Sequence, residues 1–392
     1  KGIEDVLGKR YFLPVHQGRA AENIIARTFV KPGQCVLTNY HFTTTLAHVN
    51  EVGGKIIELL KDEALILKSD NPFKGNIDID KLVEAIETEG AENVAFIRME
   101  ASTNLIGGQP FSIRNMMDVR QVADKYGIIL VLDASLLGEN AYLVKQREEE
   151  WKENTMADII KMMTGLADIV YFSARKLTSS RGGGICTNRR DIYAKMEALI
   201  PLFEGFLTYG GISVREIEAM AVGLYETLDE TMISQSPTFI KYMVETLDAA
   251  GIPVITPPGV LGCHIDAGTF CKHIPQEEYP AGALAAALYL ISGVRTMERG
   301  TMSSIRDENG NDVLADAELL RLAVPRRVFT LSQVNYVIDR LQWLYDNREL
   351  IGGLKFTYEP PVLRFFMGGL TPTSDWPERL VSKFRKDFGD SL

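Results

Sequence analysis

Residues 128–135 read IILVLDAS, and residues 168–174 read DIVYFSA. Each is a short apolar run that ends in polar residues, and GQCVLTN (33–39) and NVAFIRM (93–99) have the same character. Apolar runs of this length are typical of strands that are buried on both faces of a sheet. Helical patterns lie between these runs, at residues 21–30, 80–88 and 112–126. Strands that alternate with helices at this spacing predict βαβ units and a mostly parallel sheet, which is an α/β fold.

The pattern changes near residue 250, and this change predicts a second domain. A long helical stretch ends there, and GIPVITPPG (251–259) starts a new unit. The shorter elements that we expect beyond it are strands at 262–267 and 319–325 and helices at 280–291 and 331–350. We therefore predict a large α/β, cofactor-binding domain over residues 1–250 and a small α+β domain over residues 251–392.

The composition of the 392 residues is that of an ordinary globular protein, with 46% apolar residues, 24% charged residues and a net charge of −10. Acidic and basic residues are interleaved, which argues against a nucleic-acid partner, because such a partner requires a concentrated basic patch. No apolar run approaches the roughly 20 residues of a membrane-spanning helix, and no secretory signal pattern is present. The four cysteines include no CxxC pair. We therefore expect reduced thiols, a cytoplasmic location and no membrane partner.

A possible anion-binding segment, His16-Gln17-Gly18-Arg19, directly precedes the first helical pattern. A glycine at a helix start lets an anion approach the free N–H groups, and the helix dipole favours its negative charge. Arg19 would add a charge-assisted hydrogen bond. A glycine in an ordinary turn gives the same local pattern. This segment therefore indicates an anion-binding site only in combination with the other candidate segments.

Two further candidates, Asp133 and Lys176, follow predicted strands. In open α/β sheets ligands bind beyond the carboxyl ends of the strands. Asp133 could pair there with a protonated pyridine nitrogen, or it could only cap the next turn. In SARK (173–176), Lys176 could form an imine if partial burial and the cationic Arg175 lower its pKa, or it could be a surface lysine. The order of these segments, followed by RGGGI (181–185), favours a pyridoxal-phosphate site.

Ten colinear segments resemble the β-eliminating lyases, the family of tyrosine phenol-lyase and tryptophan indole-lyase. They are residues 13–24, 39–45, 71–82, 90–97, 103–110, 139–148, 204–211, 292–300, 324–330 and 354–366. The likeness extends from about residue 11 to about residue 366. It implies a fold-type I (aspartate-aminotransferase-like) pyridoxal-phosphate enzyme, assembled as a homodimer or homotetramer with active sites at the subunit interface.

The resemblance also implies roles for individual residues. Lys176 matches the lysine that carries pyridoxal phosphate as a Schiff base and acts as general base, and Asp133 matches the partner of the pyridinium nitrogen. The remaining cofactor contacts that it implies are Gln17, Gly18, Arg19 and Ser173 at the phosphate, Phe42 stacked on the ring, Asn104 near the phenolic oxygen, and Arg175 beside the lysine. Arg326 matches the arginine that grips the substrate α-carboxylate in a bidentate fork.

Four positions concern the side chain of the substrate. In the phenol-lyases an arginine in MERG and a threonine after the stacking aromatic contact the phenol hydroxyl, and here these are Arg299 and Thr43. The phenol-lyases also have LRFF where the indole-lyases have LRHF, and this chain has Phe365 and Phe366. The resemblance therefore implies β-elimination of L-tyrosine to phenol, pyruvate and ammonia.

The sequence departs from the family at several positions. Leu136 stands where the family has an arginine near the phenolic oxygen of the cofactor, which should change the electronics of the ring. Arg175 and Leu177 replace a lysine and an acidic residue. Arg181 stands where a backbone group helps to bind a monovalent cation, so a K⁺ requirement is left open, and no other metal site is expected. Leu261 replaces a histidine.

These departures keep other functions in view. The family tyrosine thought to protonate the leaving group lies upstream of HQGR (16–19), in a segment that we expect to be missing here, so no general acid is assigned. The alternatives are cleavage of L-tryptophan or of S- or O-substituted cysteine and serine, a homologue that binds pyridoxal phosphate without elimination, and another pyridoxal-phosphate reaction such as aminotransfer. Arg326 argues against lost activity, because a carboxylate clamp has no use without a substrate.

Overall fold

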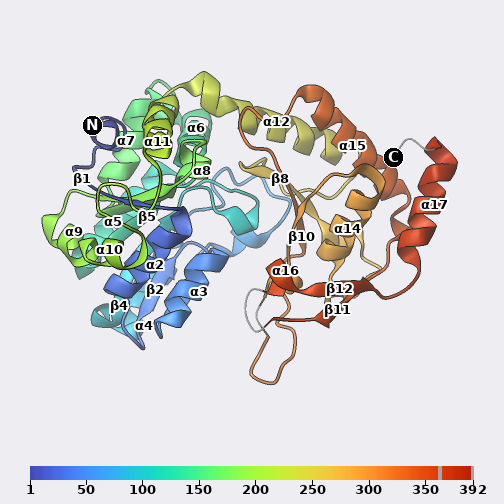
Figure 1. Ribbon diagram of the computed structural model, residues 1–392, viewed down its shortest axis with the longest axis horizontal. Helices are drawn as coiled ribbons and strands as arrows, with labels where there is room; N and C mark the ends of the chain where they lie inside the picture. Colours follow the sequence, from blue (N-terminus) through green and yellow to red (C-terminus); the bar gives the residue numbers. More distant parts are fainter. Residues whose placement is uncertain (305, 361–363, 390–392) are drawn as a thin grey trace. The chain divides into compact units, whose positions relative to one another are not determined.

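The computed structural model describes the chain except residues 305, 361–363 and 390–392. The chain forms two compact units (Figure 1). Unit 1 consists of Lys1–Ala64 and Asn71–Gln235, and unit 2 consists of Leu65–Asp70 and Ser236–Leu392. Each unit has its own hydrophobic core.

Unit 1 is built on a seven-stranded sheet with the order β1-β7-β6-β5-β4-β2-β3. Its strands are β1 (Tyr11–Val15), β2 (Cys35–Thr38), β3 (Lys55–Glu58), β4 (Val94–Glu100), β5 (Leu130–Asp133), β6 (Ile169–Ser173) and β7 (Gly183–Thr187). The strands from β6 to β3 pair in parallel, whereas β7 runs antiparallel to both of its neighbours. The four predicted strands are confirmed as β2, β4, β5 and β6, and the mostly parallel α/β sheet is confirmed with them.

Helices cover this sheet on both faces (Figure 1). They are α1 (Gly2–Leu7), α2 (Gly18–Phe29), α3 (Thr43–Glu51), α4 (Ile79–Glu89), α5 (Ile113–Tyr126), α6 (Leu137–Arg147), α7 (Met156–Gly165), α8 (Ala174–Leu177), α9 (Arg190–Glu197), α10 (Leu199–Phe203) and α11 (Val214–Glu226). Short 3-10 turns are η1 (Asp62–Leu65), η2 (Ala91–Asn93), η3 (Asn104–Ile106) and η4 (Glu149–Trp151). The predicted helices 21–30, 80–88 and 112–126 correspond to α2, α4 and α5.

The strands bury side chains on both faces because their residues alternate between two cores. In β5, Leu130 and Leu132 belong to the core that contains α4, α5 and α7, whereas Val131 belongs to the core that contains α2 and α9. Fully burying one such side chain stabilises the fold by about 1.5–3 kcal/mol. A continuous apolar run is therefore what a strand between two helical layers requires.

Unit 2 has a three-stranded antiparallel sheet, β8-β10-β9, and a separate two-stranded antiparallel sheet of β11 and β12. The strands are β8 (Gly262–Asp266), β9 (Met297–Arg299), β10 (Leu319–Ala323), β11 (Leu354–Tyr358) and β12 (Gly369–Pro372). The helices are α13 (Ala267–Phe270), α14 (Pro280–Ser292), α15 (Leu331–Asp346), α16 (Arg364–Met367) and α17 (Trp376–Phe388), with 3-10 turns η5 (Gln276–Glu278), η6 (Thr301–Ser303) and η7 (Arg348–Leu350). This unit has the α+β character that the sequence predicted.

Long helix α12 (Glu230–Ala249) contains the division between the two units, at Gln235 and Ser236. The sequence placed the boundary at residue 250. The second half of α12 belongs to unit 2 because Ile240, Val244 and Leu247 are buried in its core. Residues 65–70 also belong to unit 2, where Leu67 accepts a backbone hydrogen bond from Thr256 (2.9 Å).

Strand β7 has no counterpart among the predicted strands. Residues GGICT of β7 look like a turn by composition, because glycine is depleted in strands. The glycines serve close packing here, since a Cβ on Gly184 would lie 2.1 Å from the ring of Phe12 on β1. The same glycine-rich stretch therefore forms a strand that completes the sheet.

Candidate active site

The carboxyl ends of three neighbouring strands present polar side chains at one edge of the unit 1 sheet. Glu100 ends β4, Asp133 ends β5 and Ser173 ends β6. Glu100 pairs with Asp133 across β4 and β5, and β5 pairs in turn with β6. This edge of a parallel sheet is where α/β proteins bind ligands.

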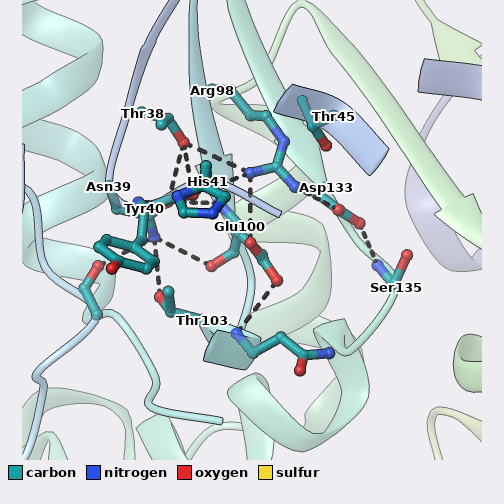
Figure 2. A network of polar contacts seen from close by, with 12 residues as sticks. Thr38, Asn39, Tyr40, His41, Thr45, Arg98, Glu100, Thr103, Asp133 and Ser135 are labelled. Atoms are coloured by element: carbon teal, nitrogen blue, oxygen red, sulfur yellow. Dashed lines mark hydrogen bonds and ion pairs between the residues drawn. The ribbon is translucent and has the colours of Figure 1, made fainter. Parts of the chain in front are cut away.

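Asp133 is buried and held by three hydrogen bonds. Its Oδ2 accepts from Arg98 Nη2 (2.7 Å), and its Oδ1 accepts from the Ser135 N–H (3.0 Å; Figure 2). The Tyr171 hydroxyl also donates to Oδ2 (2.9 Å). Burial alone would raise the pKa of Asp133, but the positive charges of Arg98 and Lys176 outweigh it and lower this pKa. Ser135 is thus the neighbour that donates to Oδ1, and a carboxylate oxygen can accept a further N–H group.

Glu100 connects Arg98 to the loop that contains Asn104. Its Oε2 accepts from Arg98 Nη1 (3.3 Å; Figure 2), and its Oε1 accepts from the Asn104 N–H (3.2 Å). Burial raises the pKa of Glu100 to about 7, against the opposing effect of the Arg98 guanidinium. Glu100 can therefore change its charge near neutral pH without leaving the network.

This raised pKa predicts a pH-dependent stability. Between pH 4.5 and about 7 the folded protein keeps a proton on Glu100 that the unfolded chain has released. The free energy of unfolding should therefore fall as pH rises through this window, by at most about 1.4 kcal/mol per pH unit. Urea unfolding at pH 5, 6 and 7 should show a flatter pH dependence for Glu100→Gln than for the wild type.

Part of the slope should persist in the Glu100→Gln variant. Burial also raises the pKa of Glu298, in unit 2, to about 7. Glu298→Gln serves as the comparison, because it should remove a similar contribution without touching the sheet edge. Identical slopes for the wild type and Glu100→Gln would show that Glu100 does not titrate in this range.

Buried Glu22, on α2, fixes the start of α3. Its carboxylate accepts hydrogen bonds from the hydroxyls of Thr44 (2.5 Å) and Thr45 (2.7 Å), and its Oε1 lies 3.4 Å from the Tyr171 hydroxyl. Phe42 is the N-cap residue of α3 and Thr43 its first residue. The hydrogen bonds of Asp133 thus continue, through Tyr171 and Glu22, to the helix that presents Phe42 and Thr43.

Helix α2 presents an uncapped N-terminus beside Ser173. Its N-cap residue Gln17 makes no side-chain capping hydrogen bond. A Cβ on Gly18 would lie 2.8 Å from Ser173 Cβ, so only glycine permits this close approach of α2 to β6. Backbone N–H groups at the start of α2, the Ser173 hydroxyl and the exposed Arg19 are donors suited to a phosphate group. Together with the acceptor Oδ1 of Asp133, this donor set fits pyridoxal phosphate.

Lys176 lies in the short helix α8, directly after β6. The side chain is half-buried, and Nζ lies 5.0 Å from the centroid of the Phe42 ring. Its positive charge lowers the pKa of both Asp133 and Glu100, so the amine lies within electrostatic reach of this network. Neighbouring Arg175 is exposed. Unit 1 thus brings the predicted lysine, carboxylate and aromatic side chains together.

The predicted substrate contacts, apart from Thr43, lie in unit 2. Arg299 ends β9 and is buried, and its guanidinium carbon lies 5.9 Å from the centroid of the Phe365 ring. The rings of Phe365 and Phe366 have centroids 4.0 Å apart, and Phe366 is half exposed. Half-buried Arg326 lies in a turn after β10. Unit 2 thus brings Arg299 and Phe365 together, whereas Arg326 comes from a separate segment.

Four residues that hold Asp133 and α3 in place were not predicted from the sequence: Arg98, Glu100, Tyr171 and Glu22. A usable signal was present for two of them. Arg98 and Glu100 interrupt the apolar run of β4 at alternate positions, and alternate residues of a strand share one face. Charged residues inside a doubly buried strand must be paired.

Arg181, at the position that the resemblance links to a monovalent cation, lies near an acidic side chain. Arg181 Nη1 lies 3.9 Å from Glu216 Oε1. Across residues 1–304, 306–360 and 364–389, no group of three or more His, Cys, Asp or Glu side chains could hold a metal ion. The same residues include no helix that combines the length and the apolar character needed to span a membrane.

Comparison with known proteins identifies the family. The family model described as β-eliminating lyase matches residues 1–340. A tyrosine phenol-lyase of Pasteurella multocida is 41% identical over 372 residues, which is 94% of this chain and 81% of that protein. A tyrosine phenol-lyase of Fusobacterium nucleatum is 41% identical over 366 residues, covering 93% of this chain and 80% of that protein.

Solved structures support the fold at much lower identity. Serine palmitoyltransferase from S. paucimobilis with bound PLP has a TM-score of 0.60 and 12% identity, covering 89% of this chain and 76% of that one. The complex of SepCysS with the SepCysE N-terminal domain has a TM-score of 0.56 and 13% identity, covering 88% and 83%. These likenesses confirm the predicted fold-type I architecture. Taken with the family model and the relatives, they show that this chain belongs to the β-eliminating lyase family of pyridoxal-phosphate enzymes.

Proposed function

We propose that the chain cleaves L-tyrosine by β-elimination, releasing phenol, pyruvate and ammonia. Relatives that are 41% identical over more than nine-tenths of the chain are tyrosine phenol-lyases. The structural observation that carries the proposal is the buried guanidinium of Arg299 beside the Phe365 ring. An aromatic ring with a polar hydroxyl suits a site built from an aromatic side chain and a charged donor.

Residues of unit 1 bind and orient the cofactor in this proposal. The N-terminal N–H groups of α2, with Arg19 and Ser173, hold its phosphate, and Asp133 Oδ1 accepts the hydrogen bond of its ring nitrogen. The remaining contacts are Gln17 and Gly18 at the phosphate, Phe42 on the face of the ring, Asn104 at the phenolic oxygen and Arg175 beside the lysine. When bound, the cofactor supplies an electron sink for negative charge that develops at the substrate Cα.

The proton chemistry is assigned to Lys176. Its Nζ takes the proton from the substrate Cα. The hydrogen-bond network around Asp133 holds this negative carboxylate next to the positive ring nitrogen. Thr43 and Arg299 hydrogen-bond the phenol hydroxyl, while Phe365 and Phe366 pack around the ring. Arg326 binds the α-carboxylate.

Replacing Arg326 with alanine is expected to raise KM for every amino-acid substrate. A charged hydrogen bond contributes about 1.5–3 kcal/mol, so KM should rise about 10- to 100-fold. Arg326→Lys keeps the charge but loses the planar fork, and its KM should lie between the two. Steady-state kinetics on two different substrates measures this, and values within twofold of wild type would assign the clamp to another residue.

A panel of amino acids tests the proposed activity. Purified protein with pyridoxal phosphate is mixed separately with L-tyrosine, L-tryptophan, S-methyl-L-cysteine and O-acetyl-L-serine, and pyruvate and the released aromatic are followed. Pyruvate and equimolar phenol from L-tyrosine support the proposal. Pyruvate without release of an aromatic product from any substrate would assign the chain to carbon–sulfur or carbon–oxygen elimination. No pyruvate, with cofactor bound, would indicate another reaction or a homologue without elimination.

Leu136 favours carbon–sulfur elimination as the second candidate. It is buried and precedes α6, where the resemblance has an arginine near the phenolic oxygen of the cofactor. A weaker electron sink would penalise carbon–carbon cleavage more than the easier carbon–sulfur cleavage. The relative rates on L-tyrosine and S-methyl-L-cysteine, in the wild type and in Leu136→Arg, measure this effect.

We also propose a homodimer or homotetramer in the cytoplasm. Exposed apolar side chains gather between residues 202 and 214 of unit 1, at Leu202, Phe203, Phe206 and Val214. Large exposed apolar patches mark interaction surfaces. The four cysteines are all free and buried, as expected in a reducing compartment. Light scattering on the purified protein gives the subunit count, and a monomer would contradict the proposed assembly.

A further inference from the structure

Three buried charged groups meet at the carboxyl edge of the unit 1 sheet. Arg98, Glu100 and Asp133 are each 5% exposed or less. One guanidinium serves both carboxylates, with Nη2 on Asp133 Oδ2 (2.7 Å) and Nη1 on Glu100 Oε2 (3.3 Å; Figure 2). The cluster has no net charge when Glu100 is protonated, and it carries one negative charge when Glu100 is ionised.

The guanidinium is firmly fixed, so its charge cannot move away from either carboxylate. Arg98 Nε donates to the Tyr171 hydroxyl (2.9 Å), and Nη1 also lies 3.3 Å from the backbone oxygen of Tyr40 and 3.4 Å from Thr38 Oγ1. A buried arginine with this many partners stays in place and stays ionised. The variable charge in the cluster is therefore that of Glu100.

We propose that Arg98 and Glu100 are positioning residues that set how much negative charge Asp133 presents to the ring nitrogen of the bound cofactor. This inference rests on the proposed contact between that nitrogen and Asp133 Oδ1. When Glu100 is ionised, it balances Arg98, and Asp133 acts as a full negative charge towards the ring. When Glu100 is neutral, Arg98 is balanced by Asp133 alone, and the ring nitrogen holds its proton less tightly.

Glu100 is also hydrogen-bonded to a residue that is proposed to contact the opposite end of the cofactor ring. Its Oε1 accepts the N–H of Asn104, the residue proposed to contact the phenolic oxygen. Glu100 thus contacts Arg98, which pairs with the residue at the ring nitrogen, and Asn104, the residue at the phenolic oxygen. The groups that act on the charge of Glu100 are Arg98 from the same strand, Asp133 from β5, Lys176 from α8 and the Asn104 N–H.

Glu100 should change its charge in the physiological range, because burial raises its pKa to about 7. The ring nitrogen should therefore hold its proton more tightly above pH 7 than below pH 6. An isolated pyridine nitrogen has no such dependence, since its proton affinity is fixed. The predicted effect is opposite in sign to simple titration, and this gives it a distinct signature.

The test uses holoenzyme loaded with pyridoxal phosphate that carries ¹⁵N in the ring, because the ¹⁵N chemical shift distinguishes a protonated from a neutral pyridine nitrogen. At pH 8, Glu100→Gln should lower the ratio of protonated to neutral nitrogen about tenfold, since a nearby charge shifts a pKa by about one unit or more. At pH 5.5 the variant and the wild type should agree, because Glu100 then carries its own proton.

A double variant separates charge from structure. Arg98→Gln combined with Glu100→Gln removes both charges and should restore the wild-type ratio at pH 8, whereas a merely structural role would make the double variant worse than the single one. Arg120→Gln is the matched control, because Arg120 pairs with Asp168 (2.9 Å) next to the opposite end of β6. This control should leave the ¹⁵N shift unchanged.

Failure of this inference can be distinguished from failure of the proposed function. Asp133→Asn should lower the protonated fraction at both pH values, and no change there would overturn the placement of the ring nitrogen. If Asp133→Asn has its effect but Glu100→Gln gives the wild-type shift at pH 8, the role of Glu100 is excluded. A Glu100→Gln effect of equal size at pH 5.5 and pH 8 would also overturn the inference. If Glu100→Gln does not fold, the pH dependence of the ¹⁵N shift in the wild type is the test. A ring nitrogen that does not hold its proton more tightly above pH 7 than below pH 6 would then overturn the inference.

Discussion

Replacing Lys176 with alanine is expected to remove the visible absorption band of the bound cofactor and to abolish β-elimination. Lys176 Nζ is the amine that lies beside Phe42 and within electrostatic reach of Asp133. Loss of a positioned general base alone costs about 10²–10⁴-fold in rate, and loss of the covalent attachment adds to this. Absorbance spectra and pyruvate release from the wild type and the variant measure both effects.

The control for this experiment is an exposed lysine that lies outside the sheet edge. Lys161 on α7 is exposed, and Lys161→Ala should keep both the band and the activity. Added methylamine offers a further check, because a small amine can replace the missing proton acceptor. A Lys176→Ala protein with an unchanged spectrum would refute the assignment of this lysine.

Replacing Arg299 with isoleucine is expected to remove most activity on L-tyrosine while sparing S-methyl-L-cysteine. Arg299 is buried beside Phe365, so isoleucine fills part of its volume and leaves no donor for a phenol hydroxyl. Sites built to hydrogen-bond a substrate hydroxyl discriminate by up to about 10⁴–10⁵. The leaving group of S-methyl-L-cysteine does not need this contact, and kcat/KM for the two substrates measures the difference.

Arg295, which is exposed in the segment before β9, provides the matched control. Arg295→Ile should leave both substrates unaffected. Equal losses on L-tyrosine and S-methyl-L-cysteine in Arg299→Ile would show that Arg299 only supports the structure of unit 2. The substrate assignment would then return to an unspecified β-eliminating lyase.

The central strands were predictable because burial on two faces leaves a simple signal. Runs such as IILVLDAS have no polar face, and the structure gives β5 a core on each side. The carboxyl-end position of Asp133 then follows from the parallel sheet. By contrast, β7 could not be predicted from composition, because its glycines are explained only by distant segments of the chain. Gly184 packs against Phe12 of β1, and Gly183 packs against backbone atoms of Phe172 and Gln17.

The candidate site was predictable where chemistry marks a residue, and not where only packing does. Lys176 and Asp133 belong to a motif order with a known use, whereas Tyr171 and Glu22 look like ordinary strand and helix residues. Their role depends on hydrogen bonds between β6, β5 and α2, which come together only in the folded sheet. The boundary between the units could not be predicted for a similar reason. It lies within the continuous helix α12, and no local sequence signal marks where the helix passes from one core to the other.

Residues 65–70 belong to unit 2 although unit 1 precedes and follows them in the sequence, and this has a consequence for folding during synthesis on the ribosome. The chain passes between the two units three times, after Ala64, after Asp70 and after Gln235. Residues 65–70 leave the ribosome long before Thr256, to which Leu67 is hydrogen-bonded. Unit 1 can therefore begin to fold early with this segment as a loop, while unit 2 can be completed only late in translation. Contacts of such long sequence separation form slowly, and the folding of unit 2 therefore depends on a segment that lies between two stretches of unit 1 in the sequence.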